Sequence, residues 1–254
     1  MKKAASFALG CKVNQYESEA IAELFAEKGY EIVGIDEEAD VYVINTCTVT
    51  NFGDKKSRQL IRKVKRQNEN AIVAVVGCYA QTAPKELMEI AGVNLVIGTK
   101  DRAQIVEMVE QYDRANGVEN HVSDIMKERV FEPLSIQKLA NRTRAYLKIQ
   151  DGCSQYCSYC IIPYARGPIR SREPQEVVAE VKRLAENGFK EVVLTGIHVA
   201  SYGKDRKDTS LLDILKQVHE VEGIERIRFS SIEPNVVTEE FAQTMAALPK
   251  VCDH

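Results

Sequence analysis

The stretch Cys153-Ser-Gln-Tyr-Cys157-Ser-Tyr-Cys160 places three thiols at C-x3-C-x2-C spacing on one short segment. Thiolates are soft ligands that suit iron–sulfur clusters, and a complete cubane cluster normally takes four of them. Three thiols on one loop would therefore leave one iron open to a cofactor or a substrate. A zinc loop is less favoured, because structural zinc takes four closed ligands and His198 lies far along the chain. Three cysteines cannot all pair among themselves, so a disulfide loop is less favoured still.

The composition is that of a soluble globular protein, with 254 residues, 44% hydrophobic and 28% charged. No stretch approaches the ~18 consecutive apolar residues of a membrane span, so we expect no membrane partner. The amino terminus reads as a first strand and not as a signal peptide, so we expect a cytoplasmic protein whose seven cysteines bind metal or catalyse. The net charge of −3 gives no global attraction to nucleic acid.

The first hundred residues alternate between strand and helix patterns. Strands are predicted at 4–9, 41–44, 71–76 and 95–97, and helices from 14 to 29, from 54 to 66, from 84 and from 101 to 111. Asn14 is expected to cap the first helix, with Glu17 three residues on. The buried face of that helix would hold Ile21, Leu24 and Phe25. Uninterrupted apolar runs are typical of strands buried on both faces, so the pattern predicts a doubly wound α/β unit.

Cys11, Cys47 and Cys78 each follow a predicted strand and precede a predicted helix. Because the carboxyl ends of parallel strands gather on one edge of a sheet, these three thiols can meet in space. One such cysteine alone is more often structural, since free cysteine behaves as a small hydrophobe. Three in equivalent positions favour a second three-thiol ligand set.

The remainder of the chain predicts a linker at 114–140 and three βα units after it. Their strands are predicted at 143–149, 191–195 and 226–230, and their helices at 174–187, 211–221 and 238–248. Three such units open a barrel but cannot close it, so the last strand should present an unpaired edge. The predicted fold class is α/β: a doubly wound parallel-sheet domain at 1–113, followed by an incomplete βα barrel at 141–254.

The loop at residues 153–160, with Tyr159 inside it and a barrel strand before it, resembles the radical S-adenosylmethionine enzymes. In that superfamily the open iron is chelated by the amino and carboxylate groups of S-adenosylmethionine. Electron transfer from the cluster then cleaves a carbon–sulfur bond and releases a 5′-deoxyadenosyl radical. Such chemistry needs a low-potential cluster in a pocket that excludes water.

Further segments resemble the methylthiotransferases, which carry a second cluster on three cysteines of a separate domain. The matching segments are residues 9–18, 45–50, 77–81, 150–153, 164–167 and 194–203. They are most similar to the group that modifies N6-threonylcarbamoyladenosine beside the tRNA anticodon. Members of this family continue through the rest of a six-unit barrel into a small RNA-binding β-domain (TRAM), and both are absent from these 254 residues.

The resemblance implies two [4Fe-4S] clusters and S-adenosyl-L-methionine as cofactors. Cys153, Cys157 and Cys160 would hold the cluster that binds S-adenosylmethionine, and Cys11, Cys47 and Cys78 would hold an auxiliary cluster that takes the sulfur to be inserted. Tyr159 would lie near the adenine, Thr195 and Gly196 near the methionine end, and Ser230 and Ser231 near the ribose. For these last four residues, ordinary strand-end hydrogen bonding is an equally good interpretation. No catalytic residue is assigned beyond the cluster ligands.

The activity that the resemblance implies is insertion of a methylthio group at C2 of the modified adenosine at tRNA position 37. One S-adenosylmethionine would methylate the sulfur, and a second would yield the radical that abstracts the hydrogen. The implied partners are tRNA, an electron donor of the flavodoxin or ferredoxin type, and a sulfur source. The alternatives are a sister enzyme acting on isopentenyladenosine or on a ribosomal-protein aspartate, a non-catalytic iron–sulfur module, and a zinc-stabilised RNA-binding protein.

Several charged residues keep two interpretations open. Residues 55–66 carry seven basic side chains, which could follow tRNA phosphates or form a solvated helix face. Arg166, Arg170 and Arg172 could bind the carboxylate of S-adenosylmethionine or the tRNA backbone, or could form ion pairs. His198 is expected to be a hydrogen-bonded structural histidine.

Overall fold

The computed structural model describes residues 1–48, 51–136 and 144–252, with the backbone alone at 51–54. The chain forms two compact units that interleave along the sequence. The first unit consists of Met1–Glu128, Glu132–Leu134 and Gln155–Gly167, and the second of Arg129–Phe131, Ser135–Ser154 and Pro168–His254. The carboxyl end of the predicted linker, 137–140, and the predicted strand residue Thr143 lie outside the described residues.

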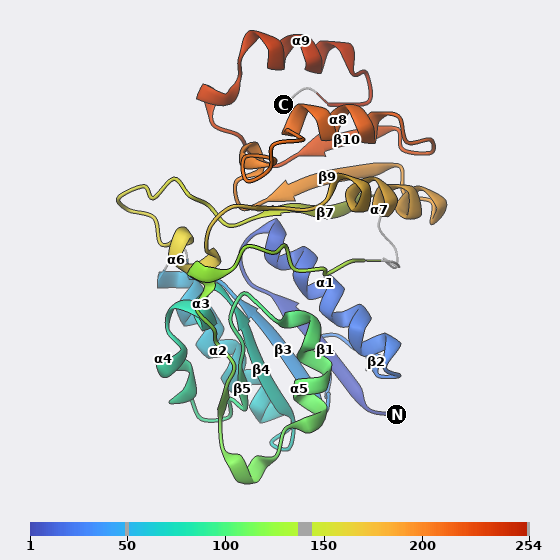
Figure 1. Ribbon diagram of the computed structural model, residues 1–254. Helices are drawn as coiled ribbons and strands as arrows, with labels where there is room; N and C mark the ends of the chain where they lie inside the picture. Colours follow the sequence, from blue (N-terminus) through green and yellow to red (C-terminus); the bar gives the residue numbers. More distant parts are fainter. Residues whose placement is uncertain (49–50, 137–143, 253–254) are drawn as a thin grey trace. The chain divides into compact units, whose positions relative to one another are not determined.

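The first unit is built on a parallel sheet of six strands in the order β2-β1-β3-β4-β5-β6 (Figure 1). Its strands are β1 (Lys3–Ala8), β2 (Glu31–Ile32), β3 (Val41–Thr46), β4 (Ile72–Gly77), β5 (Leu95–Val96) and β6 (Glu119–Asn120). Its helices are α1 (Lys12–Glu27), α2 (Asn51–Gln67), α3 (Cys78–Thr82), α4 (Pro84–Met88), α5 (Ile105–Gln111) and α6 (Ile162–Arg166), with 3₁₀ turns η1 (Arg102–Gln104), η2 (Arg114–Asn116) and η3 (Ile125–Lys127).

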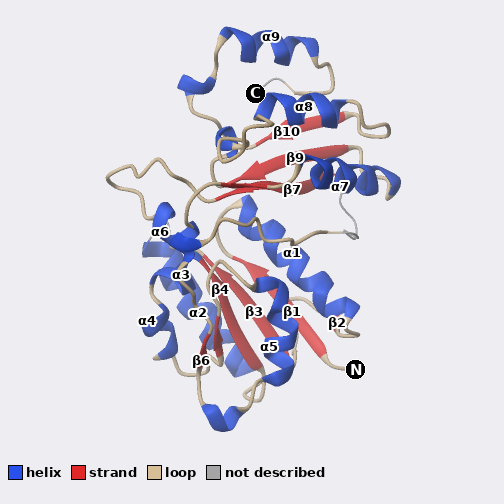
Figure 2. Cartoon of the chain, viewed as in Figure 1, coloured by secondary structure: helices blue, strands red, loops and turns tan. Residues whose placement is uncertain are grey.

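Both faces of this sheet are covered by helices, which confirms the doubly wound α/β prediction (Figure 2). Val41 and Val43 of β3 pack with Ile21 and Phe25 of α1, together with residues of α5. The alternate residues of the same strand pack on the other face, against α2 and α4. Successive side chains of a strand point to opposite faces, so a strand buried on both sides needs an uninterrupted apolar run.

The sheet order brings the ends of three strands together. Strands β1, β3 and β4 are neighbours, with Ala8 opposite Asn45 and Thr46 opposite Gly77 in the registers. The segments that follow these strands therefore begin at one edge of the sheet. Each of the three segments carries a cysteine within its first three residues.

Some local predictions for the first unit were wrong. Cys11, and not Asn14, is the N-cap of α1, and it makes no side-chain capping bond. Asn14 and Glu17, the predicted capping pair, are instead fully buried, and both side chains bond to residues far along the chain. Helix α2 begins at Asn51, three residues before the predicted start at 54.

The second unit contains a four-stranded sheet in the order β10-β9-β7-β8. Its elements are β7 (Arg144–Asp151), β8 (Arg170–Ser171), α7 (Pro174–Glu186), β9 (Glu191–Gly196), η4 (Val199–Ser201), α8 (Leu211–His219), β10 (Arg226–Phe229), η5 (Pro234–Val236) and α9 (Glu239–Ala247). Strands β7, β9 and β10 are parallel, and β8 is antiparallel to β7. The parallel strands with their helices form the half-barrel that the sequence predicts.

The outer edge of β10 is partly paired, which corrects the prediction of an unpaired edge. Ile227 forms a parallel bridge with Val251. The Ile227 amide donates to the Lys250 carbonyl at 2.7 Å, and the Cys252 amide donates to the Ile227 carbonyl at 2.9 Å. The carboxyl-terminal residues therefore satisfy backbone groups that an edge strand would otherwise leave to solvent.

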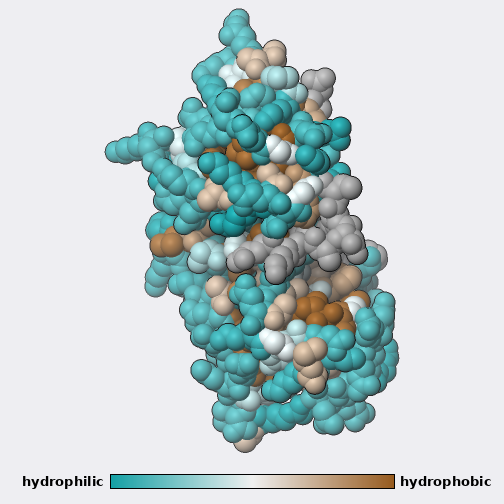
Figure 3. Space-filling model, turned by 90° about the vertical axis from the view of Figure 1, so that its right-hand side faces the viewer, coloured by the Kyte–Doolittle hydropathy of each residue, from teal (hydrophilic) through white to brown (hydrophobic). Residues whose placement is uncertain are grey.

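The surface is mostly hydrophilic on the face drawn in Figure 3, with scattered apolar patches. Among the described residues, no helix has both the length and the apolar character that crossing a membrane requires.

Candidate functional site

The cysteines of the first unit follow three neighbouring strands, as the sequence predicts. Cys11 precedes α1 and is exposed, Cys47 follows β3, and Cys78 is the first residue of α3 and is buried. A Cβ atom built on Gly10 would lie 2.8 Å from the Cys47 sulfur, which shows how closely the first two loops approach. Cys11 is also close enough to Cys78 to affect the pKa of its thiol. The three thiols thus share one edge of the sheet.

Asn14 joins the loops that carry two of these cysteines. Its amide nitrogen donates to the Leu9 carbonyl at 2.8 Å and to the Thr46 carbonyl at 2.9 Å. Leu9 lies two residues before Cys11, and Thr46 lies directly before Cys47. Its amide oxygen faces the Cys11 sulfur at 3.6 Å. Placed in the first turn of α1, Asn14 therefore holds the ends of β1 and β3 at a fixed separation.

Replacing Asn14 with alanine is expected to lower the free energy of unfolding by about 2–3 kcal/mol, because two carbonyl groups would lose their buried donor. Urea-induced unfolding followed by circular dichroism measures this change. Lys12→Ala is the matched control, since Lys12 is an exposed residue of the same helical turn. An equal effect of the two substitutions would contradict this role of Asn14.

Arg166, the last residue of α6, reaches the third cysteine. Its Nε donates to the Cys78 sulfur at 3.1 Å, and its Nη1 contacts Glu17 Oε1 at 2.6 Å. Its Nη2 donates to Asn14 Oδ1 and, at 3.1 Å, to Glu17 Oε2. All these residues belong to the first unit.

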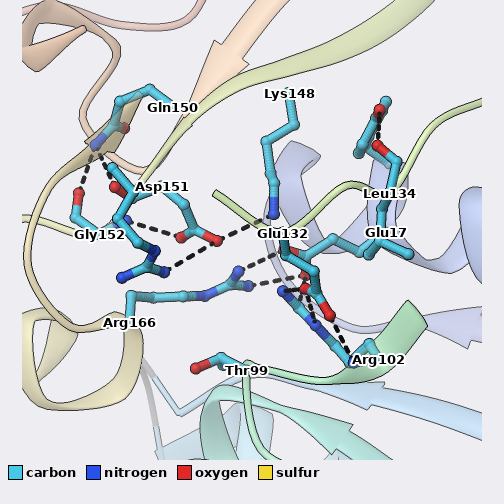
Figure 4. Close-up of polar contacts among 12 residues, drawn as sticks. Glu17, Thr99, Arg102, Glu132, Leu134, Lys148, Gln150, Asp151, Gly152 and Arg166 are labelled. Carbon is cyan, nitrogen blue, oxygen red and sulfur yellow. Dashed lines mark hydrogen bonds and ion pairs between the residues drawn. The ribbon is translucent and has the colours of Figure 1, made fainter. Parts of the chain in front are cut away.

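Glu17 also pairs with a second buried arginine. Arg102 Nη1 lies 2.6 Å from Glu17 Oε2, and the same guanidinium pairs with Glu132 (Figure 4). The side chains of Glu17, Arg102 and Arg166 are fully buried. Two guanidinium groups and two carboxylates therefore form a charge-balanced cluster, which Arg166 connects to Cys78.

Burial raises the pKa of the Cys78 thiol to about 11, although the nearby Arg166 guanidinium opposes this rise. We expect iodoacetamide to alkylate exposed Cys11 at least about tenfold faster than Cys78 in metal-free protein at pH 7, because Cys78 is buried and its raised pKa leaves little of the nucleophilic thiolate. The Cys78 rate should increase about tenfold per pH unit up to pH 9, since the thiolate fraction increases in that proportion below the pKa. Mass spectrometry of digested peptides over time measures both rates, and equal rates at pH 7 would contradict the expectation.

The loop with the other three cysteines is divided between the two units. Cys157 and Cys160 belong to the first unit and Cys153 to the second. The Cys160 amide donates to the Cys157 carbonyl at 2.9 Å, which closes a turn around Tyr159. Tyr159 is 90% exposed, so the tyrosine predicted near the adenine is open to solvent. Tyr156 has a positive φ of 49° and packs edge-on against Tyr164.

A buried polar network lies at the base of this loop, in the second unit. The Lys148 ammonium donates to Asp151 Oδ2 at 3.0 Å, and Asp151 Oδ1 accepts the Gly152 amide at 2.8 Å. Gln150 donates to the carbonyls of Asp151 and Gly152, both at 2.7 Å (Figure 4). The Gln150 side-chain oxygen accepts the backbone amide of His198 at 2.8 Å. These contacts fix the backbone directly before Cys153.

The residues predicted to contact S-adenosylmethionine lie at the ends of β9 and β10. The hydroxyl groups of Thr195 and Ser230 are 2.7 Å apart. A Cβ on Gly196 would lie 2.7 Å from the Gln150 side-chain oxygen, so close packing explains the glycine. Ser231 is exposed. The structure thus brings Thr195 and Ser230 together, and their binding to a cofactor stays a prediction.

Ion pairing holds the three arginines after the loop, all of which are buried. Besides Arg166, Arg170 Nη2 lies 3.6 Å from Asp151 Oδ2, and Arg172 pairs with Glu180. His198 contacts Glu233 at 2.7 Å and also Ser201, which agrees with its expected structural role. These contacts favour ion pairing over tRNA or cofactor binding for Arg170 and Arg172.

Part of the basic surface of α2 is occupied by contacts within the first unit. Arg58 donates to Glu86 and to Tyr79, both at 2.6 Å, and Lys63 pairs with Asp36. Lys65 donates to the carbonyls of Glu69 and Ala71. These contacts favour the solvated-face interpretation for this part of the helix.

The donor set agrees with the implied clusters, because three thiols gather at one sheet edge beside a cationic donor. Thiolate ligands and hydrogen bonds to sulfur are characteristic of iron–sulfur sites. In the ranges that the structure describes, no three cysteine, histidine, aspartate or glutamate side chains are already arranged to hold a metal ion. Metal ligation by the six cysteines is therefore still a prediction.

The sequence interpretation missed the cluster of Asn14, Glu17, Arg102 and Arg166. A signal was present, since Asn14 and Glu17 precede Ile21 and Phe25 at helical spacing and so extend the buried face of α1. Polar residues on a buried face need buried partners. Sequence spacing could not identify those partners, because Arg166 lies 149 residues beyond Glu17.

Two family models match the chain. One is described as "Uncharacterized protein family UPF0004" and covers residues 3–98, and the other is the radical SAM superfamily, over residues 147–254. The solved structure of the radical S-adenosylmethionine methyltransferase TsrM from Kitasatospora setae is similar over 98% of this chain and 58% of its own length. Its TM-score is 0.63 at 17% sequence identity, a likeness of fold.

Curated relatives are similar over the whole chain. The threonylcarbamoyladenosine tRNA methylthiotransferase MtaB of Bacillus subtilis (strain 168) is 50% identical, over 100% of this chain and 56% of the relative. Its namesake from Aquifex aeolicus is 40% identical, over 99% and 61%. The tRNA-2-methylthio-N(6)-dimethylallyladenosine synthase of Dictyoglomus thermophilum is 34% identical, over 96% and 56%. The chain therefore spans a little over half the length of these relatives.

Proposed function

Because the chain belongs to the radical S-adenosylmethionine methylthiotransferase family, we propose that it inserts a methylthio group at C2 of N6-threonylcarbamoyladenosine at position 37 of tRNA, 3′ to the anticodon. The observation that carries this proposal is the placement of Cys11, Cys47 and Cys78 at one edge of the first sheet, in a chain that also has the radical SAM loop. A fold does not define a reaction, whereas a second set of three thiols offers a site for the sulfur. The relatives with the threonylcarbamoyladenosine name are 33–50% identical and the dimethylallyladenosine synthases 34–36%; the two identities above this shared range, 50% and 40%, both belong to the first name and support this nucleoside.

The radical SAM match implies a [4Fe-4S] cluster and S-adenosylmethionine. In this proposal Cys153, Cys157 and Cys160 hold that cluster, and the three cysteines of the first unit hold a second one. When bound, the clusters would supply the electron that cleaves S-adenosylmethionine and a site for the sulfur to be transferred. The proposed partners are tRNA, a flavodoxin- or ferredoxin-type electron donor and a sulfur source.

The protein's own residues would hold these ligands in place. The amide of Asn14 fixes the loops of Cys11 and Cys47, and the Gln150–Asp151 network fixes the backbone before Cys153. The Thr195–Ser230 pair lies at the carboxyl ends of β9 and β10, the edge where parallel sheets bind ligands. The domain bounds 1–113, 114–140 and 141–254 belong to the same proposal, and the matched segments 3–98 and 147–254 support them.

The test is an assay of the 254-residue chain, purified without oxygen and reconstituted with iron and sulfide. It receives S-adenosylmethionine, dithionite and tRNA that carries either N6-threonylcarbamoyladenosine or isopentenyladenosine. Nucleoside mass spectrometry detects the methylthio product, and chromatography detects 5′-deoxyadenosine. We expect the methylthio product from the first tRNA alone. Product from the second tRNA alone would assign the chain to the sister specificity.

Cysteine variants separate the two thiol sets. A variant with Cys11, Cys47 and Cys78 replaced by alanine should still form 5′-deoxyadenosine but no methylthio product. Replacing Cys153, Cys157 and Cys160 should abolish both. Cys252→Ala is the matched control and should behave as the unmodified chain. Zinc without iron or acid-labile sulfide, or iron without cleavage of S-adenosylmethionine, would contradict the proposal.

A further inference from the structure

We propose that Arg166 is a positioning residue for the auxiliary cluster, to which it donates a hydrogen bond through the sulfur of Cys78. This inference rests on the proposed function, in which Cys11, Cys47 and Cys78 hold that cluster. Arg166 belongs to α6, which follows the loop of Cys153, Cys157 and Cys160, so a basic side chain from that part of the sequence would border the first-unit site.

The geometry defines the orientation of the Arg166 guanidinium. One nitrogen, Nη1, contacts Glu17 Oε1 at 2.6 Å, and Nη2 contacts Glu17 Oε2 at 3.1 Å. A guanidinium is planar, so this two-point contact with a carboxylate sets its plane. The remaining Nε edge then points to the Cys78 sulfur at 3.1 Å. A lysine has a single nitrogen and cannot make all of these contacts together.

Arg166 and Arg102 share the carboxylate of Glu17. Arg102 also pairs with Glu132, whereas Arg166 also donates to the Cys78 sulfur. Both arginine side chains are fully buried, so solvent does not screen them. The donor that the Cys78 sulfur accepts from is therefore a buried cationic group.

Such a contact would have an electronic effect on a cluster. Hydrogen bonds to cluster sulfur tune its reduction potential, and a cationic donor favours the reduced, more negative state. Loss of Arg166 should therefore make the auxiliary cluster harder to reduce. Loss of a merely structural arginine would change the stability of the protein but not the potential of the cluster.

The second contribution of Arg166 is mechanical. It lies six residues after Cys160, within the segment Gln155–Gly167 that packs with the first unit. The neighbouring Ala165 carbonyl accepts the Thr99 hydroxyl at 2.7 Å, which anchors the same helix. The backbone that carries Cys157 and Cys160 is thus tied, through Arg166, to a ligand of the other thiol set.

The test uses the full chain in which Cys153, Cys157 and Cys160 are alanine, so that only the auxiliary cluster can form. Wild-type Arg166, Arg166→Gln, Arg166→Lys and Arg102→Gln are compared in this background after anaerobic reconstitution. Iron and sulfide per chain, the electron paramagnetic resonance spectrum, and the reduced fraction at a fixed potential set by dithionite and mediators are measured. For Arg166→Gln we expect the ratio of reduced to oxidised cluster to fall roughly tenfold, the effect of one charge-assisted hydrogen bond.

Arg102→Gln is the matched control, because Arg102 is as buried as Arg166 and pairs with the same Glu17 carboxylate. The two arginines differ in their other contact, which is Glu132 for Arg102 and the Cys78 sulfur for Arg166. It should keep the reduced-to-oxidised ratio of the background protein. Equal ratios for Arg166→Gln and the background protein, or equal shifts for Arg166→Gln and Arg102→Gln, would overturn the inference. If circular dichroism shows that Arg166→Gln does not fold, Arg166→Lys is the deciding variant. An altered electron paramagnetic resonance spectrum and a lower reduced-to-oxidised ratio would support the positioning role of Arg166, and values unchanged from the background protein would overturn it. A background protein without about four iron atoms per chain would instead refute the proposed cluster site itself.

Discussion

Replacing Glu17 with alanine is expected to lower the free energy of unfolding by about 3–5 kcal/mol. The carboxylate of Glu17 contacts both Arg102 and Arg166, and all three side chains are fully buried. Removing it takes a shared carboxylate away from two buried guanidinium groups, and a buried charge that loses its partner is costly. Urea-induced unfolding measures the change.

Glu27→Ala is the matched control for this prediction, since Glu27 is an exposed residue at the end of the same helix. It should change the free energy of unfolding by less than about 0.5 kcal/mol. Glu17→Gln keeps the shape of the side chain and should fall between the two variants. If Glu17→Ala unfolds at the same urea concentration as Glu27→Ala, the buried ion pairs do not stabilise the first unit.

Replacing Gly77 with alanine is expected to lower the free energy of unfolding by about 3 kcal/mol or more, and to reduce the iron held by the first-unit cysteines. Gly77 has a φ of 95°, and a Cβ there would lie 2.3 Å from Asn45 Oδ1 and 2.7 Å from the Thr46 carbonyl oxygen. The Thr46 carbonyl is part of the backbone, so the chain itself must shift. Because Cys78 follows Gly77 directly and Cys47 follows Thr46, this shift would change the separation of two thiols.

Gly117→Ala controls for backbone conformation alone. Gly117 also has a positive φ, 72°, but a Cβ there would meet nothing within 4 Å. Its cost should be about 1–3 kcal/mol, the penalty of a positive-φ backbone conformation that alanine rarely adopts, with no loss of iron. Iron analysis after reconstitution and urea-induced unfolding measure the two effects. Equal iron content and stability in the two variants would show that the contact around Gly77 has no influence on the thiols.

The fold could be predicted because its main signals are local. The apolar runs of β3 and β4 are long enough to indicate strands buried on both faces, and the glycines and polar residues between elements mark their ends. The positions of Cys11, Cys47 and Cys78 followed from the order of strands and helices. Helix starts were less accurate, because Asn14 has the residue type of a cap but is used in a buried network.

The surroundings of the cysteines could not be predicted in the same way. Arg166 follows the cysteine loop and, from the sequence, could bind a cofactor, bind tRNA or form an ion pair. Its actual partners, Glu17 and Cys78, lie 149 and 88 residues away, and a sequence pattern contains no such distance. The buried ion pair of Lys148 with Asp151 was not predicted either. The two residues are close in sequence, but the burial of Lys148 depends on how the second unit packs.

Because the two units interleave along the sequence, no contiguous fragment contains all of the first unit and nothing of the second. Residues 155–167 pack with the first unit although residues 135–154, which precede them, belong to the second. No single cut of the chain can therefore release the first unit intact, and a fragment ending near residue 134 would lack Arg166 and its ion pair with Glu17. A synthetic peptide of residues 155–167, supplied in trans, should bind such a fragment and raise its free energy of unfolding. Fragment complementation would thus measure what this segment contributes to the first unit.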